Sequence, residues 1–176
     1  MELTKIERAM LVNQYSILAI LDNDNSSEYL KKAEIVSNGY EGFYDELFDN
    51  ISDGISVAIC DETHKILSMY RVINNCISNL TQEQKDNINL DYIKFDGFDA
   101  NDGNHFVIMK FLVEVANLFE EHQNSNFNSH SMASLRRYRQ ILPIYNQVMK
   151  ENNYRLNWEG FQKILGHVIP THWLSY

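Results

Sequence analysis

Between residues 4 and 21, apolar side chains recur at intervals of three and four residues, which is the spacing of one face of an α-helix. Thr4 and Glu7 stand at capping-box spacing at the start of this segment, where each side chain can bond to the other residue's backbone N–H. Together these features predict a first helix of about five turns. Its apolar stripe consists of Leu11, Tyr15, Leu18 and Leu21.

A second helix is predicted over residues 28–38, with Ser26 or Ser27 as its N-terminal cap. Gly39 follows this segment, and glycine adopts the left-handed conformation beyond a helix end without strain. We expect one short helix within residues 40–51.

Two longer segments have the pattern of core helices. From Ile55 to Leu80, apolar residues occupy more than one helical face, which predicts a long central helix. Residues 104–122 are apolar on almost every side, so we expect the most buried helix here. Lys110 and Glu114 interrupt an apolar run that is already shorter than the roughly 20 residues a bilayer needs, which argues against a membrane span.

The segments around these helices carry weaker signals. We interpret residues 90–95 as a linker with at most a short extended piece. A helix is predicted over residues 131–150, kinked or broken at Pro143, because proline removes one helical hydrogen bond. A last short helix is expected to be capped by Asn157 and closed by Gly166.

These elements predict an all-α fold: a single multihelical domain of six to eight helices with two central buried helices, at residues 55–80 and 104–122. The helical domain is expected to span residues 2–165. Residues 166–176 are expected to form a C-terminal tail.

Composition narrows the possible partners. The 176 residues carry a net charge of −9, and residues 22–62 alone hold eleven acidic side chains against Lys31 and Lys32. A nucleic acid is held by lysines and arginines that replace its counterions, so we expect no nucleic-acid binding through this domain alone. Charged residues among the first ten positions leave no apolar core for a signal peptide, which predicts a cytoplasmic location. Cys60 and Cys76 are predicted to be free thiols.

The segment FDGFDANDG, residues 95–103, resembles a loop that holds a divalent cation. Aligning its last glycine with the glycine of an EF-hand leaves only Asp102 as a ligand, so the calcium hypothesis fails. Gly97 allows a turn, and Asp99, Asn101 or Asp102 can accept free amide hydrogens at the start of the next helix. We therefore interpret the segment as a helix cap.

A metal site is the sharper chemical possibility. Two Asp-x-x-His pairs place a carboxylate and an imidazole on one helix face, as in di-iron bundles. Such a site needs two further carboxylates, for which Glu7 or Glu114 can serve, but no feature selects them. Solvated caps and surface residues explain the pairs more simply, and we expect no cofactor. The weak candidate ligands are Asp61, His64, Asp102 and His105.

A compact basic patch lies near the C-terminal end, where Arg136, Arg137 and Arg139 surround Tyr138. Arginine pairs bidentately with carboxylates, so we predict an interaction surface that meets the acidic residues 22–62 of another copy, with exposed aromatic residues such as Tyr138 and the tail's Trp173 adding apolar area. This predicts a homodimer or a larger closed oligomer. Pairing of the arginines with acids of their own chain is nearly as good an explanation.

Four segments in order resemble the YfbU family, and their order and spacing carry the resemblance rather than any single motif. They are LTKIERAMLVNQYSILAILD at 3–22, NGY at 38–40, ILSMYRVI at 66–73 and GFDA at 97–100. The resemblance covers roughly residues 2–165. The matching residues are Glu7, Arg8, Leu11, Asn13, Gln14, Tyr15, Asp22, Gly39, Tyr40, Met69, Tyr70, Gly97, Phe98 and Asp99.

The resemblance implies an all-helical intracellular domain of a bacterium or its phage, without assigned catalysis or cofactor. Some members carry a DNA-binding segment ahead of the domain, which would make the domain a sensing or partner-binding part. The present sequence begins at the domain, so we expect no such segment. The Asp-x-x-His pairs and the tail depart from the family pattern.

Two hypotheses for function follow. The favoured one is a non-catalytic intracellular interaction or regulatory module with a protein partner, because no group of residues has a complete set of catalytic roles. The alternative is a metal-dependent enzyme with a carboxylate and histidine site in a helical bundle.

Overall fold

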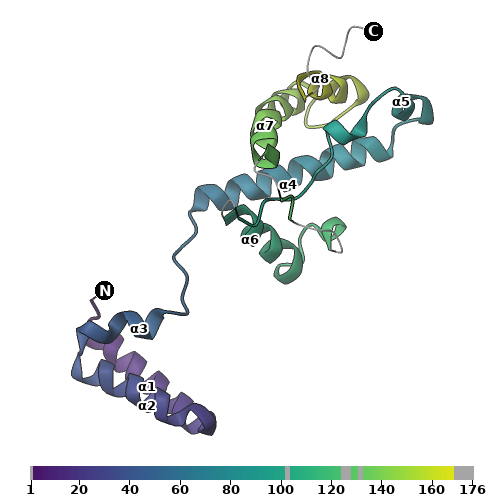
Figure 1. The fold of residues 1–176 in the computed structure, drawn as a ribbon. Helices are drawn as coiled ribbons and strands as arrows, with labels where there is room; N and C mark the ends of the chain where they lie inside the picture. Colours follow the sequence, from purple (N-terminus) through teal and green to yellow (C-terminus); the bar gives the residue numbers. More distant parts are fainter. Residues whose placement is uncertain (1, 102–103, 124–127, 131–132, 169–176) are drawn as a thin grey trace. The chain divides into compact units, whose positions relative to one another are not determined.

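The protein is helical in both of its parts. The computed structural model describes residues 2–101, 104–123, 128–130 and 133–168. These residues form eight α-helices and no β-strand beyond an isolated bridge, so the predicted all-α class and the number of helices are confirmed. Their contacts define two compact units, residues 1–54 (unit 1) and 55–176 (unit 2) (Figure 1). No helix in the described part of the chain combines the length and apolar character needed to span a bilayer.

Helix α1 (Lys5–Leu21) opens unit 1. The Thr4 hydroxyl accepts a hydrogen bond from the Glu7 N–H, and the Glu7 carboxylate accepts one from the Thr4 N–H at 2.7 Å. The predicted capping box is therefore confirmed. One side of α1 packs along α2 (Ser26–Asn38), so the two helices form a hairpin (Figure 1).

The second helix ends as predicted and starts differently. Gly39 follows α2 with a φ of +68°, a left-handed conformation that is strained for a residue with a Cβ, so this position favours glycine. At the other end, the 3-10 turn η1 (Asn23–Asn25) leads directly into the helix. Ser26 is thus its first residue, and the prediction of Ser26 or Ser27 as the cap is wrong. Unit 1 ends with η2 (Glu41–Phe43) and α3 (Tyr44–Phe48).

Helix α4 (Val57–Ser78) is the central element of unit 2 and confirms the long helix predicted there. Its buried residues are Thr63, Ile66, Leu67, Met69, Tyr70 and Ile73. The helices that contact it are α6 (Asn104–Lys110), α7 (Ala133–Glu151) and α8 (Trp158–Val168) (Figure 1). Between α4 and α6 the chain forms α5 (Gln82–Asp86) and η3 (Leu90–Tyr92), and it makes no strand in the predicted linker.

The prediction of one continuous helix over residues 104–122 is wrong. Helix α6 passes into a single π-helical turn, η4 (Phe111–Val115), and the chain then reverses through Asn117 and Phe119, which have φ values of 52° and 57°. The left-handed conformation costs a non-glycine residue roughly 1–2 kcal/mol. Burial of the Phe119 ring under the Arg71 guanidinium, 4.3 Å from the ring centroid, offsets that cost. The 3-10 turn η5 (Glu120–His122) follows.

The last two helices differ from the prediction at Pro143 and at Gly166. Helix α7 continues through Pro143 without interruption, because packing on both sides of the proline outweighs the one lost hydrogen bond. The Asn157 side chain caps α8 by accepting from the Gly160 N–H at 2.9 Å, as predicted. Helix α8 continues past Gly166, so the prediction that this glycine closes it is wrong. Residues 169–176 of the predicted tail lie outside the described residues.

The described part of the acidic segment, residues 95–101, contains a turn. Gly97 has a φ of +86°, as the predicted turn requires. The Asp99 carboxylate accepts from the Asn101 N–H at 2.9 Å, two residues along the chain, so within the described residues it caps this turn. Asp102 lies outside the described residues.

Two buried tyrosines lie at the centre of unit 2. The Tyr138 hydroxyl accepts from the Asp96 N–H and donates to the Gly97 carbonyl, both at 2.9 Å, and so holds this loop against α7. Burial raises the pKa of Tyr138 to about 12, so the hydroxyl keeps its proton at neutral pH. The Tyr70 ring packs edge-on against Tyr138 with centroids 5.1 Å apart, but its hydroxyl has no hydrogen-bond partner among the described residues.

These tyrosines provide a matched test of the loop anchor. Tyr138→Phe leaves an N–H and a C=O of the loop without a partner, so we expect the free energy of unfolding to fall by about 1–3 kcal/mol. Tyr70→Phe removes an unpaired hydroxyl and should leave stability unchanged or slightly raised. Urea denaturation followed by circular dichroism measures both variants, and equal losses would contradict this account.

Candidate functional site

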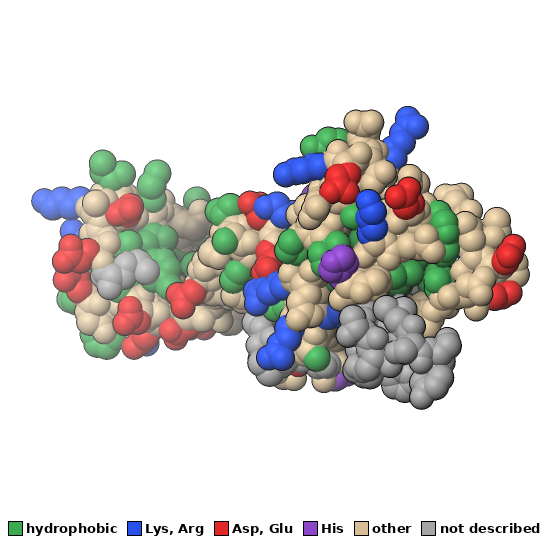
Figure 2. Space-filling view, turned by 90° about the horizontal axis from the view of Figure 1, so that it is seen from above, with side chains coloured by type: hydrophobic (Ala, Val, Ile, Leu, Met, Phe, Trp, Pro, Cys, Tyr) green, Lys and Arg blue, Asp and Glu red, His purple; other side chains and the backbone are tan. Residues whose placement is uncertain are grey.

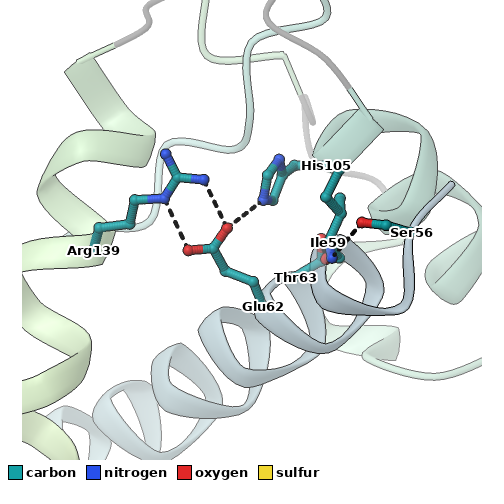
Figure 3. A network of polar contacts seen from close by, with 6 residues as sticks. All are labelled: Ser56, Ile59, Glu62, Thr63, His105 and Arg139. Carbon is teal, nitrogen blue, oxygen red and sulfur yellow. Dashed lines mark hydrogen bonds and ion pairs between the residues drawn. The ribbon is translucent and has the colours of Figure 1, made fainter.

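A polar cluster joins three helices of unit 2 (Figure 3). Glu62 extends from α4, His105 from the start of α6 and Arg139 from α7. We call these three residues the Glu62 network. His105 is 43 positions and Arg139 is 77 positions from Glu62 along the chain, so only the packing of the helices brings the three residues together.

Both carboxylate oxygens of Glu62 are occupied. Arg139 donates from Nε to one oxygen and from a terminal nitrogen to the other, each at 2.8 Å, which is the bidentate geometry of strong arginine and carboxylate pairs. His105 Nε2 lies 2.8 Å from the oxygen that the terminal nitrogen also contacts. The His105 side chain is 8% exposed and Glu62 is 26% exposed, whereas Arg139 is half exposed.

The start of α4 sets the direction in which Glu62 extends. Ser56 adopts an extended conformation and its hydroxyl accepts from the Ile59 N–H, which fixes the first turn. The Thr63 hydroxyl donates to the Ile59 carbonyl at 2.8 Å (Figure 3). Glu62 is three residues after Ile59 and four before the buried Ile66, so it belongs to the inward side of the helix. That spacing is the sequence signal by which Glu62 can be found.

The electrostatics of the network favour a structural role. The Arg139 guanidinium holds the pKa of Glu62 at about 2, against the opposing effect of burial and with a smaller contribution from His105. A carboxylate that is always ionised at neutral pH and has both oxygens paired is a poor general base. The arrangement can instead tie α4, α6 and α7 together.

The structure places the four candidate metal ligands in different settings. Asp61 and His64 are exposed on α4, and the His64 ring packs edge-on against Phe119. His105 belongs to the Glu62 network, and Asp102 lies outside the described residues. Within the described part of the chain, no three His, Cys, Asp or Glu side chains are grouped so that they could hold a metal ion. Among the described residues, no complete set of ligands supports the metal hypothesis.

The predicted basic patch is largely paired within its own chain. Arg137 forms an ion pair with Asp96, and Arg139 binds the carboxylate of the Glu62 network. Tyr138 is fully buried, so the expectation that it is exposed is wrong, and Arg136 is exposed. Association of copies through this patch stays a prediction, although two of its arginines already have carboxylate partners.

A cleft of about 800 Å³ lies beside the first half of α7. Charged and polar side chains dominate its walls, including Lys94, Asp96, Arg137 and Gln140. Small-molecule pockets are mostly apolar with a few placed polar groups, and the pairing of Arg137 with Asp96 reduces the charge available to a ligand. We assign no ligand to this cleft.

Fold and site together define an all-helical protein in which the polar cluster connects helices of the core. The chain belongs to the YfbU family, since the family model described as YfbU domain matches residues 1–166 and so spans both units. The predicted resemblance is confirmed.

Several relatives carry the name UPF0304 protein. One from Methanocaldococcus jannaschii, UPF0304 protein MJECS11, is 34% identical over 81% of this chain and 87% of its own length. One from Actinobacillus succinogenes is 26% identical over 94% of this chain and 99% of its own length. UPF0304 protein PM1500 from Pasteurella multocida is 25% identical with the same coverage.

The low pKa of Glu62 makes a pH-dependent contribution to stability. Because the pKa falls from 4.5 to about 2 on folding, the contribution is complete above about pH 5 and is lost as the pH falls toward 2. We expect Glu62→Gln to lower the free energy of unfolding by about 2 kcal/mol at pH 7 and by much less at pH 3. Urea denaturation at both pH values measures the difference.

Asp61→Asn is the matched control, because it removes the neighbouring, exposed acid of α4. It should leave the free energy of unfolding within about 0.5 kcal/mol of wild type at both pH values. A loss for Glu62→Gln that does not change between pH 7 and pH 3 would contradict the ion-pair account.

Proposed function

We propose that the chain is a non-catalytic module that binds a protein partner on the outer side of α6 and η4. The observation that supports this proposal is an apolar stripe at four-residue spacing. Val107, Phe111 and Val115 are 53%, 51% and 67% exposed, and Leu118 continues the stripe. Contiguous exposed apolar surface of this kind is typical of protein interaction sites.

The stripe has the composition of an interface. Lys110 and Glu114 flank it as a half-exposed ion pair, which supplies a polar rim. The opposite side of the same segment is in the core, where Met109 and Val113 are fully buried. This segment is apolar on two sides. Its inner side packs in the core, and its outer side is available for a partner. The face of the molecule drawn in Figure 2 carries hydrophobic, basic and acidic side chains, so exposed apolar residues are not confined to this stripe.

The polar groups support a non-catalytic role. The carboxylate of Glu62 is engaged by Arg139 and His105, and the described residues hold no group of metal-ligating side chains. The acidic chain does not favour a nucleic-acid partner, so the partner we propose is a protein with an apolar contact surface. The cytoplasmic location expected from the sequence stays a prediction.

A photo-reactive residue tests the stripe directly. With p-benzoylphenylalanine at Phe111, ultraviolet irradiation of native cells should yield a discrete adduct between the chain and another protein. Adding Val107→Lys and Val115→Lys should reduce that adduct at least about tenfold, because charge in an apolar contact is costly. Mass spectrometry identifies and quantifies the adduct.

The control carries the photo-reactive residue at Tyr154, which is an exposed aromatic between α7 and α8. It should not give the same adduct. The proposal is wrong if Phe111 gives none, or if Tyr154 gives the same product in equal yield.

Elemental analysis separates the module from a metal-dependent enzyme. We expect protein purified without chelator to contain far less than one equivalent of iron, manganese or zinc per chain. Metal near one equivalent that is lost in His64→Ala or His105→Ala, and kept in the control His167→Ala, would overturn the proposal in favour of the enzyme.

A further inference from the structure

Helix α1 has a second apolar side, opposite the side that packs on α2. This outer side is a single row of residues, which we call the α1 seam: Ile6, Met10, Asn13, Ile17 and Ile20. The four apolar members are each between 51% and 76% exposed. On the inner side of α1, Ala19 is buried, and Leu11, Tyr15 and Leu18 are partly buried.

The spacing of the α1 seam is that of a helix pair. Its members are separated by four, three, four and three residues, which keeps them on one stripe along a neighbouring helix. At 1.5 Å per residue the stripe is roughly 21 Å long. A helix with apolar residues on opposite sides is typical of an element that is covered on both.

The small core of unit 1 is a second reason to expect a cover. Its buried apolar residues are Ala19, Ala33, Ile35, Val36 and Tyr44. Units of about 50 residues seldom bury enough apolar surface for independent stability, and association is one of the common remedies. The α1 seam offers four large apolar side chains for that purpose.

Charge selects a second copy as the occupant. Residues 1–54 carry eleven acidic and four basic side chains, so most of the unit repels its own copy. Residues 9–21 carry no charged side chain at all. Two copies can therefore approach along residues 9–21 of α1 without placing like charges opposite each other, and in an antiparallel pair the charged residues 5–8 meet the uncharged end of the partner's helix.

Asn13 gives the seam a self-complementary centre. It is the midpoint of the five residues, so full overlap of two seams places it opposite its own copy whether the helices run parallel or antiparallel. A primary amide has both donors and an acceptor and can bond to an identical group. A single polar residue in an apolar seam fixes the register at some cost in stability.

We propose that two copies of the chain associate through their α1 seams as a symmetric helix pair, with Asn13 facing the partner's Asn13. This inference rests on the proposed interaction role but uses a different surface from the stripe on α6, so each can fail alone. The contact is smaller than the standard protein interface, so the dimer is expected to dissociate on dilution.

Sedimentation velocity of the full chain between about 1 and 100 µM tests the dimer. We expect a shift from monomer to dimer over this range, and a dissociation constant at least about 30-fold weaker for Ile17→Lys. Leu30→Lys changes an equally exposed apolar residue of α2 outside the seam and should leave the constant unchanged. Circular dichroism verifies that each variant keeps its helices. A wild type that is monomeric throughout, or an Ile17→Lys variant that dimerises like wild type, overturns the proposal.

A disulfide trap tests the register independently. Asn13→Cys places two thiols opposite each other in the proposed dimer, so mild oxidation should link most chains in pairs. Leu30→Cys and the wild type, which both retain Cys60 and Cys76, should stay unlinked under the same conditions. Linking of Leu30→Cys as fast as Asn13→Cys would overturn the proposed register. Adduct formation from Phe111 is read separately, so loss of the dimer leaves the proposed function open to its own test.

Discussion

Helix α4 has to be covered on more than one side, and the organisation of unit 2 follows from that requirement. Six of its residues are buried, and α6, α7 and α8 provide the cover. The packing of these helices on α4 removes water from around Glu62. Its carboxylate charge then has to be stabilised by partners within the protein. His105 and Arg139 come from two of the covering helices, so the ion pairs form as a consequence of apolar packing.

Features that depend on a few neighbouring residues could be predicted from the sequence. The capping box at Thr4 and Glu7, the left-handed glycine at residue 39 and the cap at Asn157 each depend on contacts within about four residues. In α4, the periodic pattern of apolar residues extends over enough turns to locate the central helix. The order of elements and the family resemblance could be read in the same way.

Features that depend on distant packing could not be predicted. The helical segment ends after Val115, where Asn117 and Phe119 adopt left-handed φ values. Asparagine tolerates that conformation, but one asparagine does not by itself end a helix, and the packing of Phe119 under Arg71 involves a distant residue. For Glu62, the phase of the helix could have indicated an inward side chain, but its partner His105 could not be predicted because it lies on another helix. The pairing of Arg139 with Glu62 likewise required the three-dimensional arrangement of α4 and α7.

The π-helical turn η4 has a geometric effect on the outer side of its segment. In an α-helix, residues four apart drift around the axis by about 40°, so a row at this spacing winds away from any flat surface. A turn closed by i→i+5 bonds rotates less per residue and takes up that drift. The step from Phe111 to Val115 therefore winds less around the segment than an α-helical step would, and these two exposed side chains lie closer to one line.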